Sequence, residues 1–233
     1  MGYLHKGHLS LVSEAHQHAD LVVVSIYVNP GQFSTSEDLS TYPSDFHGDI
    51  QKLMSVPGGV DVVFNPYDLY DYGRGRDSKG VATVVSKLFN IVEPDVAIFG
   101  KKDYQQWRLI CRMVRDLDFS VQIIGSEITR EDDGLAMSSR NVYLSPEEWK
   151  KALSINRSLS KAKHAAENGQ ISCKRLQDSI ILAIEEAGGN VDYAEIVDQE
   201  TLEVVEEIKA PVVICVAACF GKTRLIDNME IST

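Results

Sequence analysis

The sequence predicts an α/β fold, a doubly wound parallel sheet followed by a smaller α+β unit, and three observations support this. Short apolar runs rich in β-branched residues alternate with helical patterns, as in parallel strands joined by crossover helices. Unusual polar clusters follow two of these runs, and in such sheets function gathers at the carboxyl ends of strands. The character of the chain changes after Asn141, where a new helix start opens a second unit.

The elements of the first unit follow from their periodicity. A helix is predicted to begin at about residue 7, because apolar residues then recur at helical spacing. Residues 104–117 predict a second helix with an apolar stripe that starts at Trp107. Four short apolar runs predict buried strands, at 21–27 (LVVVSIY), 60–64 (VDVVF), 96–99 (VAIF) and 121–124 (VQII).

The second unit opens with Ser145 as the predicted N-cap and Pro146 at the first helical position. The helix runs to about residue 166, and a second one covers about 172–187. Strands are expected near 193–197 and 212–220, and the polar helix faces carry no cluster that calls for chemistry. We therefore divide the chain into a nucleotide- and substrate-binding domain, 1–143, and a lid or dimer-supporting domain, 144–233.

Composition limits the class of protein. With 233 residues, 44% hydrophobic and 24% charged, the chain is expected to be an ordinary globular protein. Its net charge of -11 argues against nucleic acid or an anionic membrane as partner. No apolar run approaches the ~20 residues of a membrane span, and no presequence precedes the first motif. Small-molecule partners are expected.

The four cysteines, Cys111, Cys173, Cys215 and Cys219, form no CxxC pair, and all but Cys173 sit in apolar stretches. This pattern favours buried, reduced thiols over disulfides or a zinc site.

The first eight residues, MGYLHKGH, indicate phosphate chemistry. Gly7 and His8 should lie at a helix N-terminus, where backbone N–H groups and the macrodipole favour an anion. Gly7 lets a nucleotide approach the backbone, and the imidazoles of His5 and His8 can hydrogen-bond a phosphoryl group under attack. A surface loop with two solvated histidines is the alternative for an isolated motif of this length.

A leaving pyrophosphate needs further cations and N–H donors. Lys102 follows the third strand beside Gly100 and is one candidate. The loop 137–141 is the other, with the hydroxyls of Ser138 and Ser139 and the guanidinium of Arg140.

Four more polar residues have open assignments. Asp103 suits a ribose hydroxyl or a structural salt bridge. Asp49 suits a bound Mg²⁺ ion, although an isolated aspartate is more often a helix cap or a surface charge. Gln32 and Gln106 are neutral hydrogen-bonding groups suited to a hydroxy acid, with a solvated side chain as the alternative for Gln106.

Taken together, the motifs resemble the pantothenate synthetase (pantoate–β-alanine ligase) family of the nucleotidylyltransferase superfamily, with its Rossmann-like fold and HIGH-like signal. The resemblance covers most of the chain. Its blocks are MGxLHxGH at 1–8, VSIxVNPxQF at 24–33, YP at 42–43, GVATVVxKLFN at 80–90, PDxxxFGxKDYQQ at 94–106, REDDGLAMSSRNVYLSPEE at 130–148 and TRLIDN at 223–228.

The resemblance implies that pantoate attacks the α-phosphate of Mg-ATP and that β-alanine then displaces AMP from pantoyl adenylate. His5 and His8 would stabilise the adenylation transition state, and Lys102, Ser138, Ser139 and Arg140 would hold the triphosphate. The remaining ATP contacts would come from Gly7, Gly100 and Asp103, with Met1 and Met137 as apolar wall. Gln32 and Gln106 would bind pantoate. A cytosolic homodimer is implied as well.

Two departures from the family pattern are expected to matter. Family members begin before the first motif with a strand that would be central in the sheet, and this chain starts at Met1. The segment between Tyr70 and Gly80 replaces a longer stretch. Lack of a central strand should leave a sheet edge without its partner.

Three functional hypotheses therefore stand. The first is a working ligase. The second is a non-catalytic, shortened isoform that associates with a full-length subunit. The third is another nucleotidyltransferase of the cytidylyltransferase kind, which the blocks around Gln32 and Gln106 fit less well.

Overall fold

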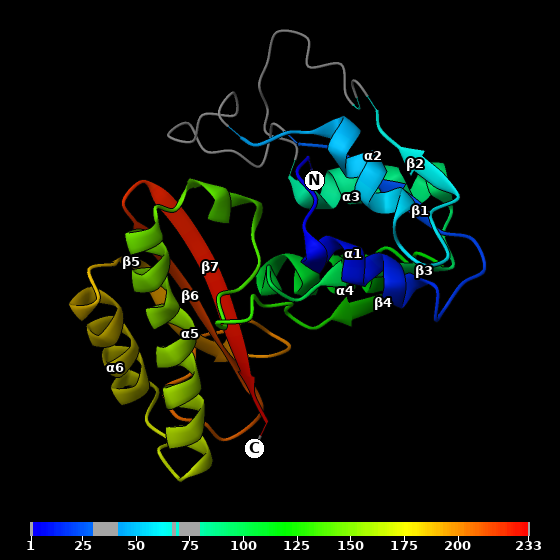
Figure 1. The fold of residues 1–233 in the computed structure, drawn as a ribbon. Coiled ribbons are helices and arrows are strands. Elements are labelled where there is room, and N and C mark those ends of the chain that lie inside the picture. The colour runs from blue at the N-terminus through cyan, green and yellow to red at the C-terminus, as the bar shows by residue number, and fades with distance from the viewer. Residues whose placement is uncertain (1, 30–41, 67–68, 70–79, 233) are drawn as a thin grey trace, which may run out of the picture. The chain divides into compact units, whose positions relative to one another are not determined.

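The computed structural model describes residues 2–29, 42–66, 69 and 80–232 (Figure 1). Contacts divide the chain into two compact units. Unit 1 comprises residues 1–101 and 106–127, and unit 2 comprises 102–105 and 128–233. Residues 102–105, which follow the third strand of unit 1, thus belong to unit 2.

Unit 1 alternates helices and strands as the sequence predicts. Its strands form two parallel pairs, β1 with β2 and β3 with β4. The elements in chain order are α1 (Lys6–Ala15), β1 (Val23–Ser25), α2 (Phe46–Met54), β2 (Val62–Phe64), α3 (Val81–Val92), β3 (Val96–Gly100), α4 (Tyr104–Asp116) and β4 (Gln122–Ser126). Helices α2 and α3 were not predicted.

The expected continuous sheet is present in the described ranges as two separate pairs, so β1 pairs with β2 alone and β3 with β4 alone. Each pair packs on its own small core, one around Leu4, Val24 and Leu53 and the other around Phe89 and Ile110.

The prediction that the first two strands are buried is wrong for Val23 and Val62, which are 40% and 51% exposed. The two are register partners on one face of the β1–β2 pair. Their neighbour Val24 points to the opposite face and is buried in the core. A two-stranded sheet with a single covered face accounts for the difference.

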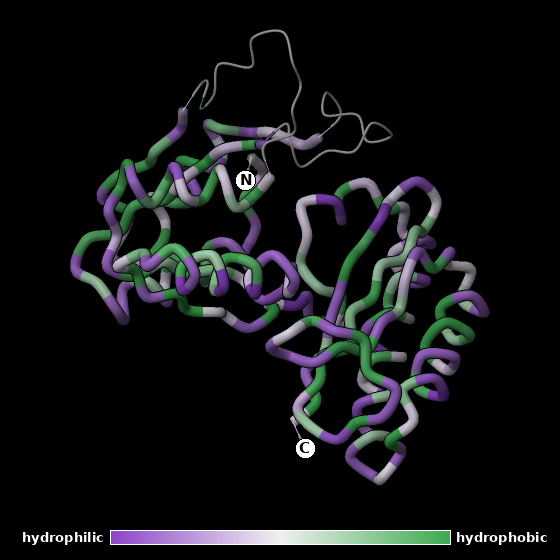
Figure 2. The backbone as a smooth tube through the Cα atoms, turned by 180° about the vertical axis from the view of Figure 1, so that it is seen from behind, coloured by the Kyte–Doolittle hydropathy of each residue, from purple (hydrophilic) through white to green (hydrophobic). Residues whose placement is uncertain are grey.

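Unit 2 is an antiparallel sheet with two helices on one face (Figure 1). Its strand order is β5 (Asn190–Asp198), β6 (Val212–Phe220) and β7 (Thr223–Ile231), and its helices are α5 (Pro146–Glu167) and α6 (Cys173–Glu186). Strand β7 was not predicted. In Figure 2, α6 alternates hydrophobic and hydrophilic residues, as expected for a helix with one buried face.

The core of unit 2 lies between this sheet and the two helices. Its fully buried members include Leu159, Ile180 and Ile214. Central strand β6 is buried along nearly its whole length, so its second face is covered as well. Any polar side chain on that second face therefore needs a partner.

The domain boundary between 143 and 144 stays a prediction. Contacts assign residues 128–143 to unit 2. Arg130 forms a β-bridge with Ala136 and an ion pair with Asp227 of β7, and these interactions tie the segment to the second sheet.

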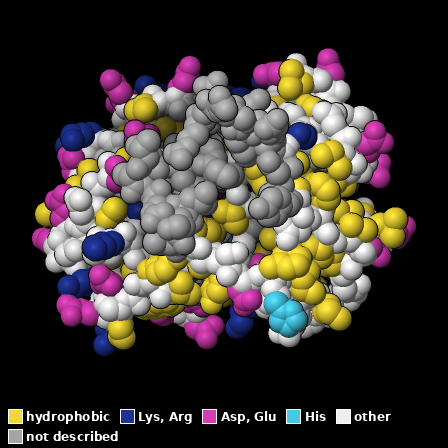
Figure 3. Space-filling view, turned by 90° about the horizontal axis from the view of Figure 1, so that it is seen from above, with side chains coloured by type: hydrophobic (Ala, Val, Ile, Leu, Met, Phe, Trp, Pro, Cys, Tyr) yellow, Lys and Arg dark blue, Asp and Glu magenta, His cyan; other side chains and the backbone are white. Residues whose placement is uncertain are grey.

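The cysteines are unpaired and the surface is of mixed charge. Cys111, Cys173, Cys215 and Cys219 are free, and Cys173 and Cys215 are buried. On the face shown in Figure 3, acidic side chains are interspersed with Lys and Arg. None of the helices in the described ranges has the length and apolar character that a membrane crossing requires.

The start of α5 is as predicted and is stabilised by a capping box. The Ser145 hydroxyl accepts a hydrogen bond from Glu148 N at 3.2 Å, and the Glu148 carboxylate accepts one from Ser145 N at 2.8 Å. The backbone N–H and then the side chain of Ser145 hold the pKa of the Glu148 carboxyl below its ordinary value. Two backbone donors of the first turn are satisfied in this way.

We expect Ser145→Ala to lower the free energy of unfolding by about 1 kcal/mol, because the cap oxygen is lost. Urea denaturation at pH 7 measures it, and Ser160→Ala, at an exposed position inside α5, is the control. The pKa of Glu148 is lower in the folded than in the unfolded chain. The Glu148 carboxylate therefore adds to the free energy of unfolding above its unfolded pKa, and this stabilisation is lost as the pH falls through the folded pKa. Equal stability of both variants would contradict the capping role.

Candidate active site

The N-terminus of α1 is built from the two histidines of the first motif. His5 is the N-cap, in extended conformation, and its Nδ1 accepts a hydrogen bond from Gly7 N at 3.2 Å. His8 Nδ1 accepts one from His5 N at 3.3 Å. The ring centroids lie 3.9 Å apart. The two imidazoles thus form a reciprocal capping box and are close neighbours.

This capping fixes the tautomer of both rings. A neutral imidazole has one donor and one acceptor nitrogen, and here Nδ1 is the acceptor in each ring. The proton of the neutral ring is then on Nε2. His5 and His8 therefore combine helix capping with a donor nitrogen beside the positive end of the α1 dipole, which suits an anionic group.

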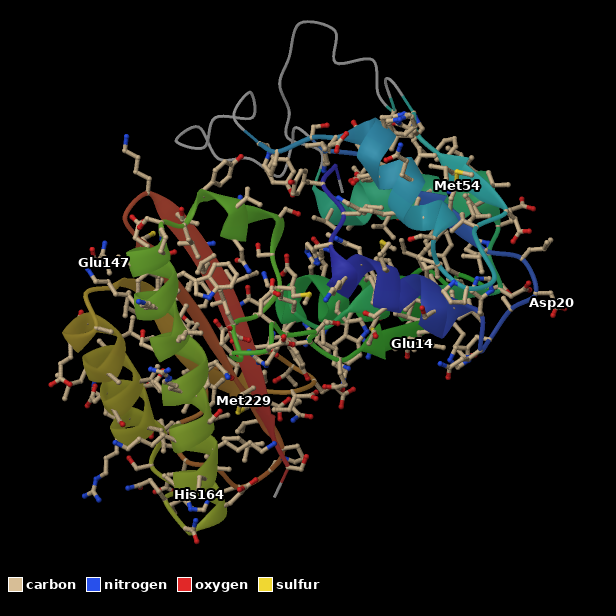
Figure 4. The ribbon with its side chains drawn as sticks, viewed as in Figure 1. Glu14, Asp20, Met54, Glu147, His164 and Met229 are labelled. Atoms are coloured by element: carbon tan, nitrogen blue, oxygen red, sulfur yellow. The ribbon has the colours of Figure 1, made fainter. Side chains whose placement is uncertain are left out.

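Helix α2 holds the chain directly before this cap. Asp49 Oδ1 accepts a hydrogen bond from Leu4 N at 2.7 Å, and Lys52 Nζ donates one to Leu4 O at 2.8 Å. Asp45 N donates to Gly2 O at 2.8 Å. Three hydrogen bonds from one helix and its N-cap thus fix the backbone of residues 2–4, so α2 orients the histidine cap. In Figure 4, Met54 marks the last turn of α2 and Glu14 marks α1.

The two oxygens of Asp49 have different surroundings. The residue is fully buried, and Lys52 Nζ lies 3.7 Å from Oδ1. Oδ2 has no hydrogen-bond partner among the described residues. Within the same ranges no group of three or more His, Cys, Asp or Glu side chains is placed to hold a metal ion. Asp49 can therefore supply one carboxylate oxygen to a cation whose other ligands come from elsewhere, which fits Mg²⁺ held mainly by phosphates and water.

Two further predicted residues belong to unit 1. Gly100 ends β3, and a Cβ at this position would lie 3.9 Å from Leu11 Cδ2, so the glycine faces α1. Gln106 lies in the first turn of α4 and is half-buried.

Lys102 lies in unit 2, with its backbone carbonyl accepting a hydrogen bond from Asn228 Nδ2 at 2.9 Å. Burial lowers the pKa of the Lys102 ammonium group, Asp227 and then Asp103 raise it, and Arg140 and then Arg130 lower it. The structure thus brings Lys102, Asp103 and Arg140 into one electrostatic group. The positive charges of Lys102 and Arg140 suit a polyanion.

The loop 137–141 has a rigid base. Met137 N donates to Thr129 O at 3.0 Å and closes a short hairpin. Ser138 caps the 3-10 helix η3 (Ser139–Tyr143), because its Oγ accepts from Arg140 N at 3.2 Å. The Asn141 amide donates to Ala136 O at 3.1 Å. Ser139 and Met137 are buried at this base, so the loop presents its polar groups in a fixed arrangement.

The predicted residues thus fall into two groups, one in each unit. Those of unit 1 are His5, Gly7, His8, Asp49, Gly100 and Gln106. The others belong to unit 2, namely Lys102, Asp103, Met137, Ser138, Ser139 and Arg140. Met1 and Gln32 lie outside the described residues.

Sequence reasoning missed the residues that support these groups, in particular Lys52, Asp227 and Asn228. A signal was present for two of them. Asp227 and Asn228 stand together in the otherwise largely apolar stretch 225–231, and a buried polar pair in a strand requires partners.

A helix N-terminus capped by two histidines in the α/β unit suits a nucleotide phosphate, and so, within unit 2, do a lysine and a Ser-Ser-Arg loop; these features indicate the class of nucleotide-binding enzymes. The comparisons identify the family. The family model described as Pantoate-beta-alanine ligase matches residues 1–230. The chain belongs to this family.

Similar proteins agree. The chain is 62% identical to a pantoate–beta-alanine ligase of Lotus japonicus, in a match that covers 100% of the chain and 90% of the relative. It is 48% identical to a pantothenate synthetase of Thermotoga petrophila, with 98% of the chain and 88% of the relative covered. The Lotus japonicus match extends over 276 residues, more than the 233 of this chain, so the relative contains a stretch without a counterpart here. This agrees with the predicted internal shortening.

Solved structures give the same result. The fold matches the crystal structure of a pantothenate synthetase from Thermus thermophilus with a TM-score of 0.92 and 40% identity, over 100% of this chain and 91% of that chain. It also matches the pantoate-beta-alanine ligase of Francisella tularensis, with a TM-score of 0.78 and 33% identity, over 98% of this chain and 86% of that chain. The predicted α/β fold with a second, smaller unit is confirmed.

The double role of His5 gives a prediction. Asparagine is also a good N-cap, so His5→Asn should keep the stability that His5→Ala loses, about 1 kcal/mol. Both variants lack the Nε2 donor. We expect both to lose turnover, on the order of 100-fold or more, as when one donor to a developing charge is removed. Thermal unfolding and kcat measured on the three proteins separate the two effects. Wild-type turnover in His5→Asn would show that capping alone matters.

Proposed function

We propose that this chain is a working pantoate–beta-alanine ligase that uses ATP to join pantoate and beta-alanine, giving pantothenate, AMP and pyrophosphate. The observation that carries the proposal is the histidine cap of α1 in a chain that belongs to this family from residue 1 to 230. The Francisella tularensis relative was solved in complex with beta-gamma ATP and beta-alanine, which supports these two ligands for the present chain. The comparisons give no support to the non-catalytic or the cytidylyltransferase alternative.

The reaction proceeds in two displacements. A carboxylate oxygen of pantoate attacks the α-phosphorus of ATP, the bond to the β-phosphate oxygen breaks, and pyrophosphate leaves with the electron pair. The amine of beta-alanine then attacks the carbonyl carbon of pantoyl adenylate, the bond to AMP breaks, and the amine releases a proton. The protein's part is positioning and charge stabilisation.

The histidines act in the first displacement. His5 and His8 donate from Nε2 to phosphate oxygens, because their Nδ1 atoms are engaged by backbone N–H groups. The positive end of the α1 dipole also favours the negative charge of the phosphate. The donors are preorganised, so no reorganisation is needed as charge develops.

The second group holds the triphosphate and the leaving pyrophosphate. Lys102 and Arg140 supply positive charge, and Ser138 and Ser139 supply hydroxyl groups. Burial and, to a smaller extent, the charge on Arg140 lower the pKa of Lys102, and a bound polyanion relieves the repulsion between the two cations. Binding of ATP and charge on Lys102 therefore support each other.

The remaining assignments extend the site. Gly7, Gly100 and Asp103, with Met1 and Met137 as apolar wall, complete the ATP contacts. Gln32 and Gln106 hydrogen-bond pantoate, whose hydroxyl groups suit neutral amides.

We also propose a homodimer, a cytoplasmic location, and a division into a substrate-binding domain, 1–143, and a lid or dimer-supporting domain, 144–233. These remain predictions from the sequence and its family.

Mg²⁺ is proposed as the companion of ATP. When bound, it supplies charge neutralisation of the phosphates. Asp49 Oδ2 would hold it, because this buried oxygen is the one that the Leu4 backbone does not use.

Pantoate-dependent exchange of labelled pyrophosphate into ATP tests the proposed function. We expect exchange with the wild-type chain and its loss in His5→Ala, because exchange requires reversible adenylation alone. The Thermus thermophilus enzyme is a positive control. A folded wild-type chain without exchange, beside an active control enzyme, would overturn the proposal.

Substitution of Asp49 separates its two roles. Asp49→Asn keeps an oxygen for Leu4 N but weakens a metal ligand, so we expect the Mg²⁺ concentration for half-maximal exchange to rise on the order of tenfold. Asp49→Ala should in addition lower the melting temperature, because Leu4 N loses its buried acceptor. An unchanged Mg²⁺ requirement in Asp49→Asn would show that Asp49 serves the backbone only.

A further inference from the structure

Strand β7 contacts both triphosphate-binding segments of unit 2 through two consecutive residues. Side chains of consecutive strand residues point to opposite faces of a sheet. Asp227 contacts the hairpin that leads to the Ser-Ser-Arg loop, and Asn228 contacts the backbone of Lys102. Both are buried, at 4% and 5% exposure. In Figure 4, Met229 marks the strand directly after this pair.

The Asp227 carboxylate is fully engaged. Its Oδ2 accepts from Arg130 Nη1 at 2.7 Å, and its Oδ1 accepts from Arg130 Nη2 at 2.9 Å and from Asn228 N at 2.8 Å. Arg130 Nη1 also donates to Gly134 O at 3.2 Å. Since Arg130 bridges Ala136 across the hairpin, this bidentate pair anchors the segment that continues into Met137 and the loop.

The opposite face of β7 carries the Lys102 segment. Asn228 Nδ2 donates to Lys102 O at 2.9 Å, and two residues further along both segments Glu230 Oε1 accepts from the Tyr104 hydroxyl at 3.1 Å. Tyr104 is 3% exposed. The matching interval of two residues shows that the segment runs alongside the strand.

The neighbouring strands agree with this placement of the segment. Cys215 of β6 is the register partner of Asn228 and of Glu195 on β5, so the three residues form one row across the sheet. Burial, then Glu195 and then Asp103 raise the pKa of the Cys215 thiol to about 12. An effect of Asp103 on Cys215 agrees with a Lys102 segment that lies over this row.

We infer that Asn228, together with its neighbour Asp227, is a positioning residue that holds Lys102 in fixed relation to the Ser-Ser-Arg loop. The chain enters unit 2 at Lys102 and leaves it after Gln105. This segment of four residues is therefore held in unit 2 by few contacts with the sheet, and each of them matters for its position. The Asn228 amide contacts the backbone of Lys102 itself. This inference rests on the proposed function, in which Lys102 and Arg140 hold one triphosphate.

The first test removes the donor of Asn228 in two ways. Asn228→Ala deletes the side chain, and Asn228→Asp keeps its shape but replaces the donating amide by an acceptor. We expect kcat for pyrophosphate exchange to fall on the order of 100-fold in both, the loss typical of a displaced catalytic group. The KM for pantoate should stay near the wild-type value, because Gln106 belongs to unit 1.

The matched control is Ser158→Ala. Ser158 is also 5% exposed, lies in unit 2 and donates one hydrogen bond, to Ile155 O within α5. It loses one buried hydrogen bond without contact to Lys102, so its kcat should remain that of the wild type. A kcat loss in Ser158→Ala equal to that in Asn228→Ala would overturn the inference, because general weakening of unit 2 would then suffice.

A second measurement does not depend on turnover. Acylation of Lys102 by an amine reagent, followed by mass spectrometry, should accelerate on the order of tenfold in Asn228→Ala, as expected from one lost hydrogen bond. Neighbouring Lys101 belongs to unit 1 and pairs with Glu127, so it serves as internal reference. Unchanged Lys102 labelling in folded Asn228→Ala and Asn228→Asp would overturn the inference even if the wild type lacked exchange.

The hydrogen bond from the Tyr104 hydroxyl to Glu230 keeps the inference testable if the Asn228 variants fail to fold. Tyr104→Phe removes one hydroxyl and should increase Lys102 labelling, whereas Glu230→Gln retains an acceptor oxygen and should leave it near the wild-type value. Wild-type labelling in Tyr104→Phe would then count against the inference. Absence of exchange in the wild type would instead refute the proposed function alone.

Discussion

The cost of burying a polar group without a partner is the constraint on which this structure depends. Asp49, Asp227 and Asn228 are each at most 5% exposed, and each needs hydrogen bonds to remain inside. Their partners are Leu4 N, Arg130 and Lys102 O, all next to candidate phosphate-binding groups. The same hydrogen bonds therefore stabilise the units and orient the site, and an alanine at any of the three positions affects both.

How much the sequence predicted depends on whether the signal was local. Ser145, Pro146 and Glu148 form a start signal for α5 that needs no other part of the chain, and the structure has it. Strand β7 was missed because Asp227 and Asn228 interrupt its apolar pattern, and only Arg130 and Lys102, far away in sequence, explain them. Helix α2 has only nine residues and contains Gly48, a poor helix former, so propensity gave no clear signal. Val23 and Val62 were predicted to be buried because composition cannot show which sheet face is covered.

In the site, too, local features were predictable from the sequence and contacts between distant residues were not. The two histidines were found from spacing and the helix start, and the structure adds that both Nδ1 atoms cap the helix, which determines the donor nitrogen. Asp49 was assigned to a cation from its residue type. That reasoning could not foresee that Oδ1 holds Leu4 N, because this contact joins residues 45 positions apart. A carboxylate with one oxygen engaged by backbone and one left over can serve both purposes, so the structural contact does not compete with a metal role.

The two adjacent lysines after β3 show that the role of a residue depends more on its surroundings in the fold than on its position in the sequence. Lys101 pairs with Glu127 and lies over the Trp107 ring, which keeps its charge within unit 1. Lys102 belongs to unit 2, where burial lowers its pKa and Asp227 and Asp103 oppose that effect. A partly buried ammonium group near two arginines gains more from an incoming polyanion than a solvated one does, because water screens it less. Under the proposed function, the environment that makes Lys102 costly to keep charged in the free protein is thus the one that strengthens its attraction to a triphosphate.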